Sequence, residues 1–193
     1  MSRPALRRTL WRSRDAMPRA ARAAGERLIR AALATSPWLR PGAAIGLYVS
    51  RGTEVGTGAL RALARRRGCR VYLPRITDYP ARRMLLLPDL GTPMRLNRYR
   101  IAEPQGGKAI APQALAVVFM PLVGFDGAGN RLGNGAGYYD RFLATRHGTR
   151  AAPVLIGIAF ECQRRAALPA AAHDVPLDAV VTEQGIQYFT RKL

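Results

Sequence analysis

The sequence predicts an α/β fold, a Rossmann-like three-layer sandwich with a mainly parallel central sheet, formed by residues 1–193 as a single domain. Short apolar runs rich in valine and isoleucine recur along the chain and are typical of parallel strands buried on both faces. Stretches with apolar residues at helical spacing separate several of these runs, and this alternation indicates the α/β class. With 193 residues, 48% of them apolar, the chain is long enough for one sizeable core.

The N-terminal third predicts helix, strand and helix in turn. Leucine and alanine at helical spacing, with arginines between them, predict a long helix over 4–34, bent at Pro18. The apolar run AAIGLYVS, 43–50, predicts a buried strand. The following stretch TEVGTGALRALARRRG predicts a helix that ends at Gly68.

The next segment predicts a second strand and then less regular structure. CRVYLP, 69–74, is expected to be a strand closed by Pro74 and parallel to the first strand, with a right-handed crossover. RRMLLLPDL, 82–90, suits an antiparallel strand. PMRLNRYRIAEPQGG, 93–107, predicts a loop with a turn at Pro104.

The C-terminal half contains the strongest strand signal. ALAVVFMPLVGF, 114–125, is apolar throughout, as a central strand covered on both faces should be. A short helix is expected over YYDRFLATRHG, 138–148, a buried strand over 153–160, and a last strand within 177–186.

The chain is strongly basic, with 31 lysines and arginines against 12 acidic residues and a formal charge of +19. All but two of the basic residues, Lys108 and Lys192, are arginines. An anionic partner such as nucleic acid, a nucleotide or a polycarboxylate would explain this charge. However, arginine is spread through the chain together with alanine, glycine and proline, which favours a compositional origin for the excess as a whole. An individual arginine can still hold a phosphate.

Other features of the composition exclude several classes of protein. No apolar run approaches the roughly 20 residues that span a membrane, and arginines interrupt the N-terminus where a signal peptide needs an apolar stretch. A cytoplasmic protein is therefore expected. Cys69 and Cys162 are far apart, which excludes a disulfide framework and argues against a structural zinc site.

A glycine-rich loop follows the strongest strand, in the stretch RLGNGAGYYDRF, 131–142. Ligands of open α/β sheets bind beyond the carboxyl ends of the strands. There, Gly133, Gly135 and Gly137 would let backbone amides approach an anion, and the N-terminus of the next helix would add partial positive charge. Arg131 offers a forked donor to phosphate, and Asp140 could reach a magnesium ion bound to it. The loop thus suits a phosphate site.

A structural interpretation of the same stretch stays open. The glycines could only shape turns, Tyr138 and Tyr139 could be core residues, and Asp140 could interact with the helix dipole. The stretch also lacks the spacing and the lysine of a P-loop. These residues by themselves predict an anion site without naming a reaction.

A longer string, MPLVGFDGAGNRLGNGAGYYDRFL, 120–143, resembles the signature of the 5-formyltetrahydrofolate cyclo-ligases. That signature reads P-x-x-x-F-D and then G-x-R-L-G-x-G-x-G-Y-Y-D. Further segments resemble the family in the same order, so the likeness covers nearly the full length: PALRRTL, LYVSRGTEVGT, VYLPR, LNRYRIAEP and HDVPLDAVVTE. Six ordered matches are far more specific than the glycine loop alone.

The resemblance implies a ligase that forms a C–N bond. It would convert 5-formyltetrahydrofolate to 5,10-methenyltetrahydrofolate with ATP and Mg2+ and release ADP and phosphate. Transfer of the γ-phosphoryl group to the formyl oxygen would give an imidate phosphate, which leaves when the neighbouring nitrogen closes the ring. Such chemistry needs mainly positioning and charge neutralisation. The implied protein is a monomer that acts on a folate, with or without a polyglutamate tail, and not on nucleic acid or a membrane.

The resemblance also implies roles for particular residues. Arg3 stands where the family usually has a lysine. Glu54 would lie near the formyl group, although a first-turn helix acid is an equal alternative. Catalysis would fall to Arg131 and Tyr139, and folate binding to Glu54, Tyr138 and Tyr139. The metal ligands would be Asp140 and Asp174, with Asp178 a weaker candidate. The implied nucleotide-binding residues are Arg3, Arg7, Arg131, Leu132, Gly133, Asn134, Gly135, Ala136, Gly137 and Tyr138.

Two alternatives remain at this point. One is a paralogous small ATP-dependent enzyme with a different acceptor. The other is a basic nucleic-acid-binding protein, which would bind RNA or DNA in a salt-sensitive way. The second alternative gives no reason for the glycine and tyrosine motif.

Overall fold

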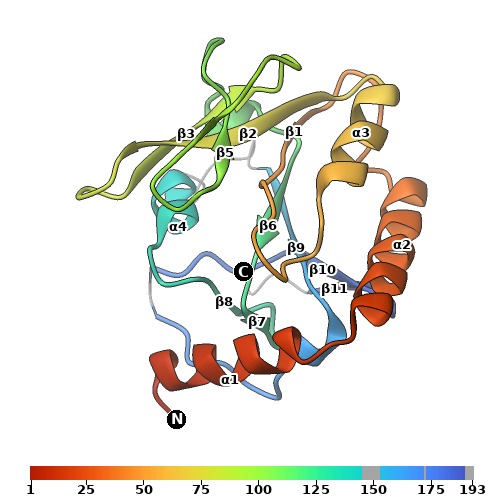
Figure 1. The fold of residues 1–193 in the computed structure, drawn as a ribbon, viewed down its shortest axis with the longest axis vertical. Helices are drawn as coiled ribbons and strands as arrows, with labels where there is room; N and C mark the ends of the chain where they lie inside the picture. The colour runs from red at the N-terminus through yellow and green to blue at the C-terminus, as the bar shows by residue number, and fades with distance from the viewer. Residues whose placement is uncertain (145–152, 172, 190–193) are drawn as a thin grey trace.

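The computed structural model describes residues 1–144, 153–171 and 173–189, and its core is a seven-stranded sheet (Figure 1). The five inner strands are parallel, and the strand at each edge runs antiparallel to its neighbour. In spatial order the strands are β11 (Gly185–Tyr188), β10 (Ala179–Thr182), β9 (Val154–Ile158), β6 (Val117–Pro121), β1 (Ala44–Gly46), β2 (Arg70–Asp78) and β3 (Arg83–Pro88). The predicted α/β class and the mainly parallel sheet are confirmed.

Helices cover the two faces of this sheet unequally within the described residues. Two helices, α2 (Arg19–Thr35) and α3 (Gly58–Arg66), pack their buried side chains on one face, with Phe119 and Ile156 from the central strands. The short helix α4 (Tyr138–Phe142) and connecting segments cover the other face. Both faces of β6 and β9 are therefore buried, which explains their uninterrupted apolar sequences.

The predicted helix over 4–34 is two helices. The first, α1 (Arg3–Asp15), ends before Pro18, and α2 begins directly after it. Pro18 has an extended backbone, with φ −56° and ψ 143°, and its ring nitrogen has no hydrogen to donate. The chain therefore turns here instead of bending, and α1 lies apart from α2 beside the end of the sheet (Figure 1).

Pro74 does not close its strand, contrary to the prediction, because β2 continues to Asp78. Up to Ile76, the even-numbered residues of β2 direct their backbone groups away from β3: the Arg70 amide donates to Ala43, and the Ile76 amide donates to a side chain. The pairing of β1 with β2 ends at Tyr72. The missing N–H of Pro74 therefore falls where no strand needs it.

The segment 93–107 is a small hairpin rather than a loop with a turn at Pro104. Its strands are β4 (Arg95–Leu96) and β5 (Ala102–Glu103). The Asn97 side chain stabilises the turn, since its Oδ1 accepts hydrogen bonds from the amides of Tyr99 and Ile101. A side-chain turn of this kind gives no periodic signal in the sequence.

The other predicted elements are present with shorter bounds, except that the single strand expected within 177–186 is two antiparallel strands, β10 and β11. The first strand and the central strand have only three and five residues. Gly68 follows α3 with φ +77°, which confirms the expected glycine stop. After β6 the chain forms a hairpin of β7 (Gly124–Phe125) and β8 (Arg131–Leu132), which leads into the glycine loop. The predicted helix 138–148 is α4, and its residues from 145 on lie outside the described part.

Candidate active site

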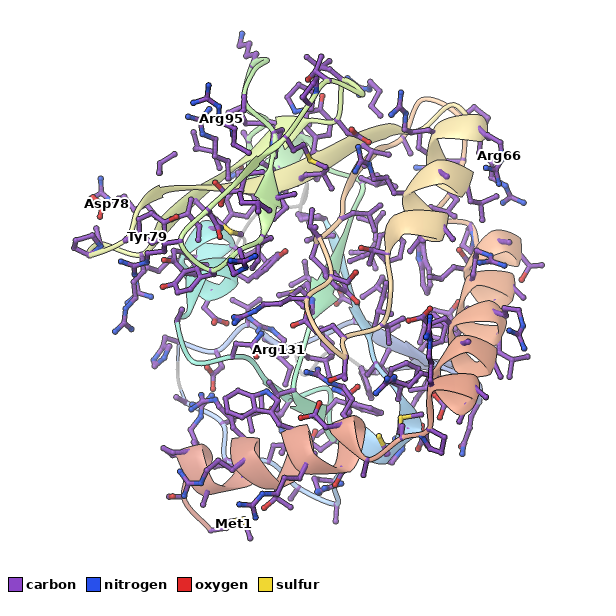
Figure 2. The ribbon with its side chains drawn as sticks, in the orientation of Figure 1. Met1, Arg66, Asp78, Tyr79, Arg95 and Arg131 are labelled. Carbon is purple, nitrogen blue, oxygen red and sulfur yellow. The ribbon has the colours of Figure 1, made fainter. Side chains whose placement is uncertain are left out.

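A cavity of about 1020 Å³ lies at the carboxyl ends of β1 and β6. Pro121, the last residue of β6, lines it together with the segment 48–54 that follows β1. Its other walls come from α1, β2, β5, α4 and the glycine loop. Figure 2 shows Arg131 near the middle of the molecule, whereas Arg66 and Arg95 lie at the periphery. The sequence analysis predicts a ligand site beyond the carboxyl ends of the strands. The cavity lies at these ends of β1 and β6.

One end of the cavity is formed by the glycine loop and α1. The Arg7 Nε donates to the Gly133 carbonyl oxygen at 2.8 Å. This hydrogen bond joins α1 to the loop, although the two residues are 126 positions apart in the sequence. Gly135 and Gly137 have φ of +103° and +69°, which glycine adopts without strain. Ala136 is not among the residues with positive φ, as expected for a residue with a Cβ. The loop conformation thus depends on its glycines.

Arginines and aspartates are interleaved at this end. The Arg131 guanidinium pairs with Asp140 at 2.5 Å, and Arg3 pairs with Asp174 at 2.9 Å. Burial, and then the neighbouring Arg3, lower the pKa of Arg7. The Nε groups of Arg3 and Arg131 are buried without a hydrogen-bond partner. Donors left over in this way indicate a site for an anion with several oxygens.

The two predicted metal ligands lie next to one another. Asp140 Oδ1 accepts the amide of Val175, the residue directly after Asp174. Within the described residues, no group of three histidine, cysteine, aspartate or glutamate side chains could hold a metal ion. Two carboxylates do not form a complete protein cage, but they suit Mg2+ that arrives with phosphate oxygens and keeps its own waters. The donor set fits a magnesium–nucleotide complex rather than a resident ion.

Two neutral tyrosines connect this end of the cavity to the other. The Tyr139 hydroxyl is buried without a hydrogen-bond partner, and burial, with Glu54 nearby, raises its pKa. Burial and the neighbouring Tyr99 hydroxyl raise the pKa of Tyr138 to about 12. Both side chains therefore stay protonated at neutral pH and can act as hydrogen-bond donors.

Glu54 lies in the loop after β1 and not in a helix, because α3 begins only at Gly58. Its alternative role as a first-turn acid is therefore wrong. One carboxylate oxygen accepts the Arg51 amide at 2.9 Å, and the other accepts Asn134 Nδ2 at 3.3 Å. This contact joins the loop after β1 to the glycine loop across the cavity.

Two of the sequence candidates do not reach the cavity. Leu132 is fully buried in a small cluster with Leu6 and Leu10, so its side chain anchors the loop. Asp178 accepts the Leu155 amide at 2.8 Å and does not line the cavity. The remaining candidates all line it: Arg3, Arg7, Glu54, Arg131, Gly133, Asn134, Gly135, Ala136, Gly137, Tyr138, Tyr139, Asp140 and Asp174.

Several residues of the cavity had no predicted role. Trp11, Tyr48 and Asn97 line it, as do Tyr99 and Glu103. The last three belong to LNRYRIAEP, a segment that resembles the family but that local patterns predict as a plain loop. Only their position in this segment could have drawn attention to them.

The fold and this site define a class of protein. A parallel sheet that carries a glycine loop and arginines at the carboxyl ends of its strands, beside an aromatic pocket, is typical of α/β enzymes that act on anionic small molecules. The family pattern of the 5-formyltetrahydrofolate cyclo-ligases matches residues 1–183, so the chain belongs to that family and is an enzyme. The resemblance stated from the sequence is confirmed.

Individual relatives agree with this assignment. The chain is 39% identical over 138 residues to 5-formyltetrahydrofolate cyclo-ligase of Haemophilus influenzae, which covers 69% of this chain and 72% of the relative. It is 37% identical over 143 residues to that of Escherichia coli K12, with 72% and 76% covered. The family and these relatives support cyclo-ligase activity on a folate.

Solved structures show the same fold. The 5,10-methenyltetrahydrofolate synthetase of Aquifex aeolicus superposes with a TM-score of 0.84 at 25% identity, over 100% of this chain and 96% of that one. The synthetase of Mycoplasma pneumoniae gives 0.74 at 25% identity, over 95% and 99%. A search of the described residues for a helix long and apolar enough to cross a membrane finds none.

Proposed function

We propose that this enzyme uses magnesium-bound ATP to close 5-formyltetrahydrofolate to 5,10-methenyltetrahydrofolate, with release of ADP and phosphate. The observation that supports it is one cavity with two chemically different ends. Unpaired arginine donors and backbone amides line one end, and tyrosines with apolar side chains line the other. A triphosphate suits the first end and a flat bicyclic ring the second. We also expect a cytoplasmic monomer.

The chain's own groups account for holding the phosphates. Arg3, Arg7 and Arg131 provide fixed positive charge, and their forked donors match phosphate oxygens. Gly135 and Gly137 let the backbone come close without a side chain in between. Asp140 and Asp174 would hold Mg2+ together with these oxygens, and the ion would neutralise charge on the transferred group.

The reaction needs little covalent chemistry from the protein. The formyl oxygen attacks the γ-phosphorus, the anhydride bond to ADP breaks, and the imidate phosphate forms on the substrate. The neighbouring nitrogen then attacks the activated carbon and loses its proton to the departing phosphate or to water, and the C–O bond breaks with release of phosphate. Arg131 would stabilise the phosphate in both steps, since its guanidinium lines the cavity and has a buried Nε without a partner. Tyr139 is a neutral donor at the junction of the two ends, and Glu54 would lie on the folate side.

The direct test mixes the protein with Mg2+, ATP and 5-formyltetrahydrofolate and follows the absorbance of the methenyl product. Product formed in proportion to ADP supports the proposal. If ATP turns over only with another acceptor, the protein is a paralogous enzyme. If no nucleotide turns over and RNA or DNA binds in a salt-sensitive way, the basic surface is the functional one.

Substitution of Gly135 by alanine is expected to weaken ATP binding about tenfold with little change in the melting temperature. A Cβ at φ +103° is strained by about 1–3 kcal/mol, and it would lie 3.4 Å from Arg7 Cζ. The exposed loop can relieve this strain only by moving away from Arg7. Isothermal titration with ATP and Mg2+ measures the change. Gly127→Ala is the control, because its Cβ would meet no atom within 4 Å. Equal affinity in both variants would contradict the phosphate role.

Tyr139→Phe is expected to lower turnover about tenfold without lowering the free energy of unfolding. The hydroxyl has no hydrogen-bond partner in the free protein, so its removal leaves no group unsatisfied and relieves a buried donor. A hydrogen bond to the bound substrate would be lost, which is worth about 1 kcal/mol or more. Chemical denaturation and steady-state kinetics measure the two effects. Full activity in this variant would remove Tyr139 from the reaction.

A further inference from the structure

Glu103 is a buried carboxylate in the wall of the cavity. It lies at the end of the cavity away from Arg3, Arg7 and Arg131. It is the last residue of β5, and only 7% of its surface is exposed. Within the part of the chain that the structure describes, no arginine or lysine forms an ion pair with it. A carboxylate buried without a cation is costly unless hydrogen-bond donors surround it.

Two donors of the protein meet Glu103, and both use the same oxygen. The Ile76 amide donates to Oε1 at 3.0 Å, and Asn97 Nδ2 donates to Oε1 at 2.7 Å. Oε2 takes part in neither bond. The Asn97 side chain is itself fixed, since its own oxygen holds the turn of the hairpin. One face of the carboxylate is thus anchored, and the other is left for a ligand.

The surroundings of Glu103 restrict what this ligand can be. Apolar side chains of Ile76, Met84 and Ile101 line the same cavity, with the Tyr99 ring among them. Such a lining favours a flat, largely apolar ring system. The carboxylate requires that the ring present N–H donors at its edge, because an acceptor there would repel it.

We propose that Glu103 recognises the pyrimidine edge of the pterin, through the ring N3–H and the 2-amino group. These adjacent donors can both reach Oε2, whose two lone pairs are left when Ile76 and Asn97 occupy Oε1. The inference rests on the proposed function, and it adds the orientation of the substrate. The pterin edge points toward β5, and the formyl group points toward Tyr139 and the glycine loop. Glu103 is a specificity-determining residue that is remote from the phosphate end.

The test compares two ligands on two proteins by isothermal titration without ATP. The ligands are 5-formyltetrahydrofolate and its analogue with hydrogen in place of the 2-amino group. Glu103→Gln keeps an Oε1 acceptor for Ile76 and Asn97 but replaces the free oxygen by a donor. We expect this substitution to weaken binding of the folate about ten- to hundredfold and binding of the analogue much less. The KM for ATP should not change.

The controls separate this inference from its alternatives. Glu161→Gln removes a carboxylate that pairs with Arg164 outside the cavity, and it should leave folate binding unchanged. Equal loss for both ligands in Glu103→Gln would show a change of pocket shape and overturn the inference. If Glu103→Gln does not fold, the comparison of the two ligands on the unaltered protein still tests the inference. Equal affinity of the unaltered protein for the folate and for the analogue would also overturn it. Failure of the unaltered protein to form product counts against the proposed function instead.

Discussion

Arg131→Lys is expected to lower kcat about a hundredfold or more, with a smaller change in the KM for ATP. The guanidinium is nearly fully buried, pairs with Asp140, and has a free Nε donor. A lysine keeps the charge, so the ion pair with Asp140 and the fold are retained. It cannot present two parallel donors to a phosphoryl group whose charge grows in the transition state. The loss should therefore fall on the chemical step.

Steady-state kinetics and thermal unfolding together test this expectation. Arg61→Lys is the matched control, because Arg61 forms a forked pair with the buried Asp89 outside the cavity. The control should lower the melting temperature and leave kcat unchanged. If kcat fell equally in Arg131→Lys and Arg61→Lys, the paired donors of the Arg131 guanidinium would act through protein stability and not on the chemical step.

The strands and helices could be predicted where burial imposes a period on the sequence. The strand β6 is apolar at nearly every position because other elements cover both of its faces, and α3 shows helical spacing up to its glycine stop. The sequence did not reveal that Pro74 continues a strand, since this depends on where β1 ends. It also did not reveal the β4–β5 hairpin, which the side chain of Asn97 stabilises through local hydrogen bonds.

The residues of the candidate site also fall into two groups: those that a local sequence pattern predicts and those that only the structure brings together. The glycine loop could be predicted because backbone freedom at Gly133, Gly135 and Gly137 is visible in the sequence itself. The pairing of Arg3 with Asp174 joins residues that are far apart in the chain, and no local pattern encodes it. In the sequence, Glu103 looks like an ordinary acidic residue of a loop. Only the structure shows that it accepts the Ile76 amide and lines the cavity.

Asp140→Asn is expected to abolish measurable turnover while the protein stays folded. Its Oδ1 accepts both the Arg131 guanidinium and the Val175 amide. Asparagine can keep the bond from Val175, but it has no charge with which to hold Mg2+ or to balance Arg131. Without the ion, charge on the transferred phosphoryl group is poorly neutralised, and we expect a loss of about 10³-fold or more in kcat. Titration of Mg2+ into the ATP complex should show weaker binding of the ion.

Asp178→Asn provides the comparison that makes this result specific. Asp178 belongs to the same segment as Asp174, but it accepts the Leu155 amide outside the cavity. An amide there should change stability only, with turnover retained. If Asp140→Asn bound Mg2+ and ATP normally and still lost turnover, Asp140 would act by positioning Arg131 rather than by holding the ion. If it kept turnover, the pair with Arg131 would be purely structural, and Asp174 would be the remaining predicted metal ligand.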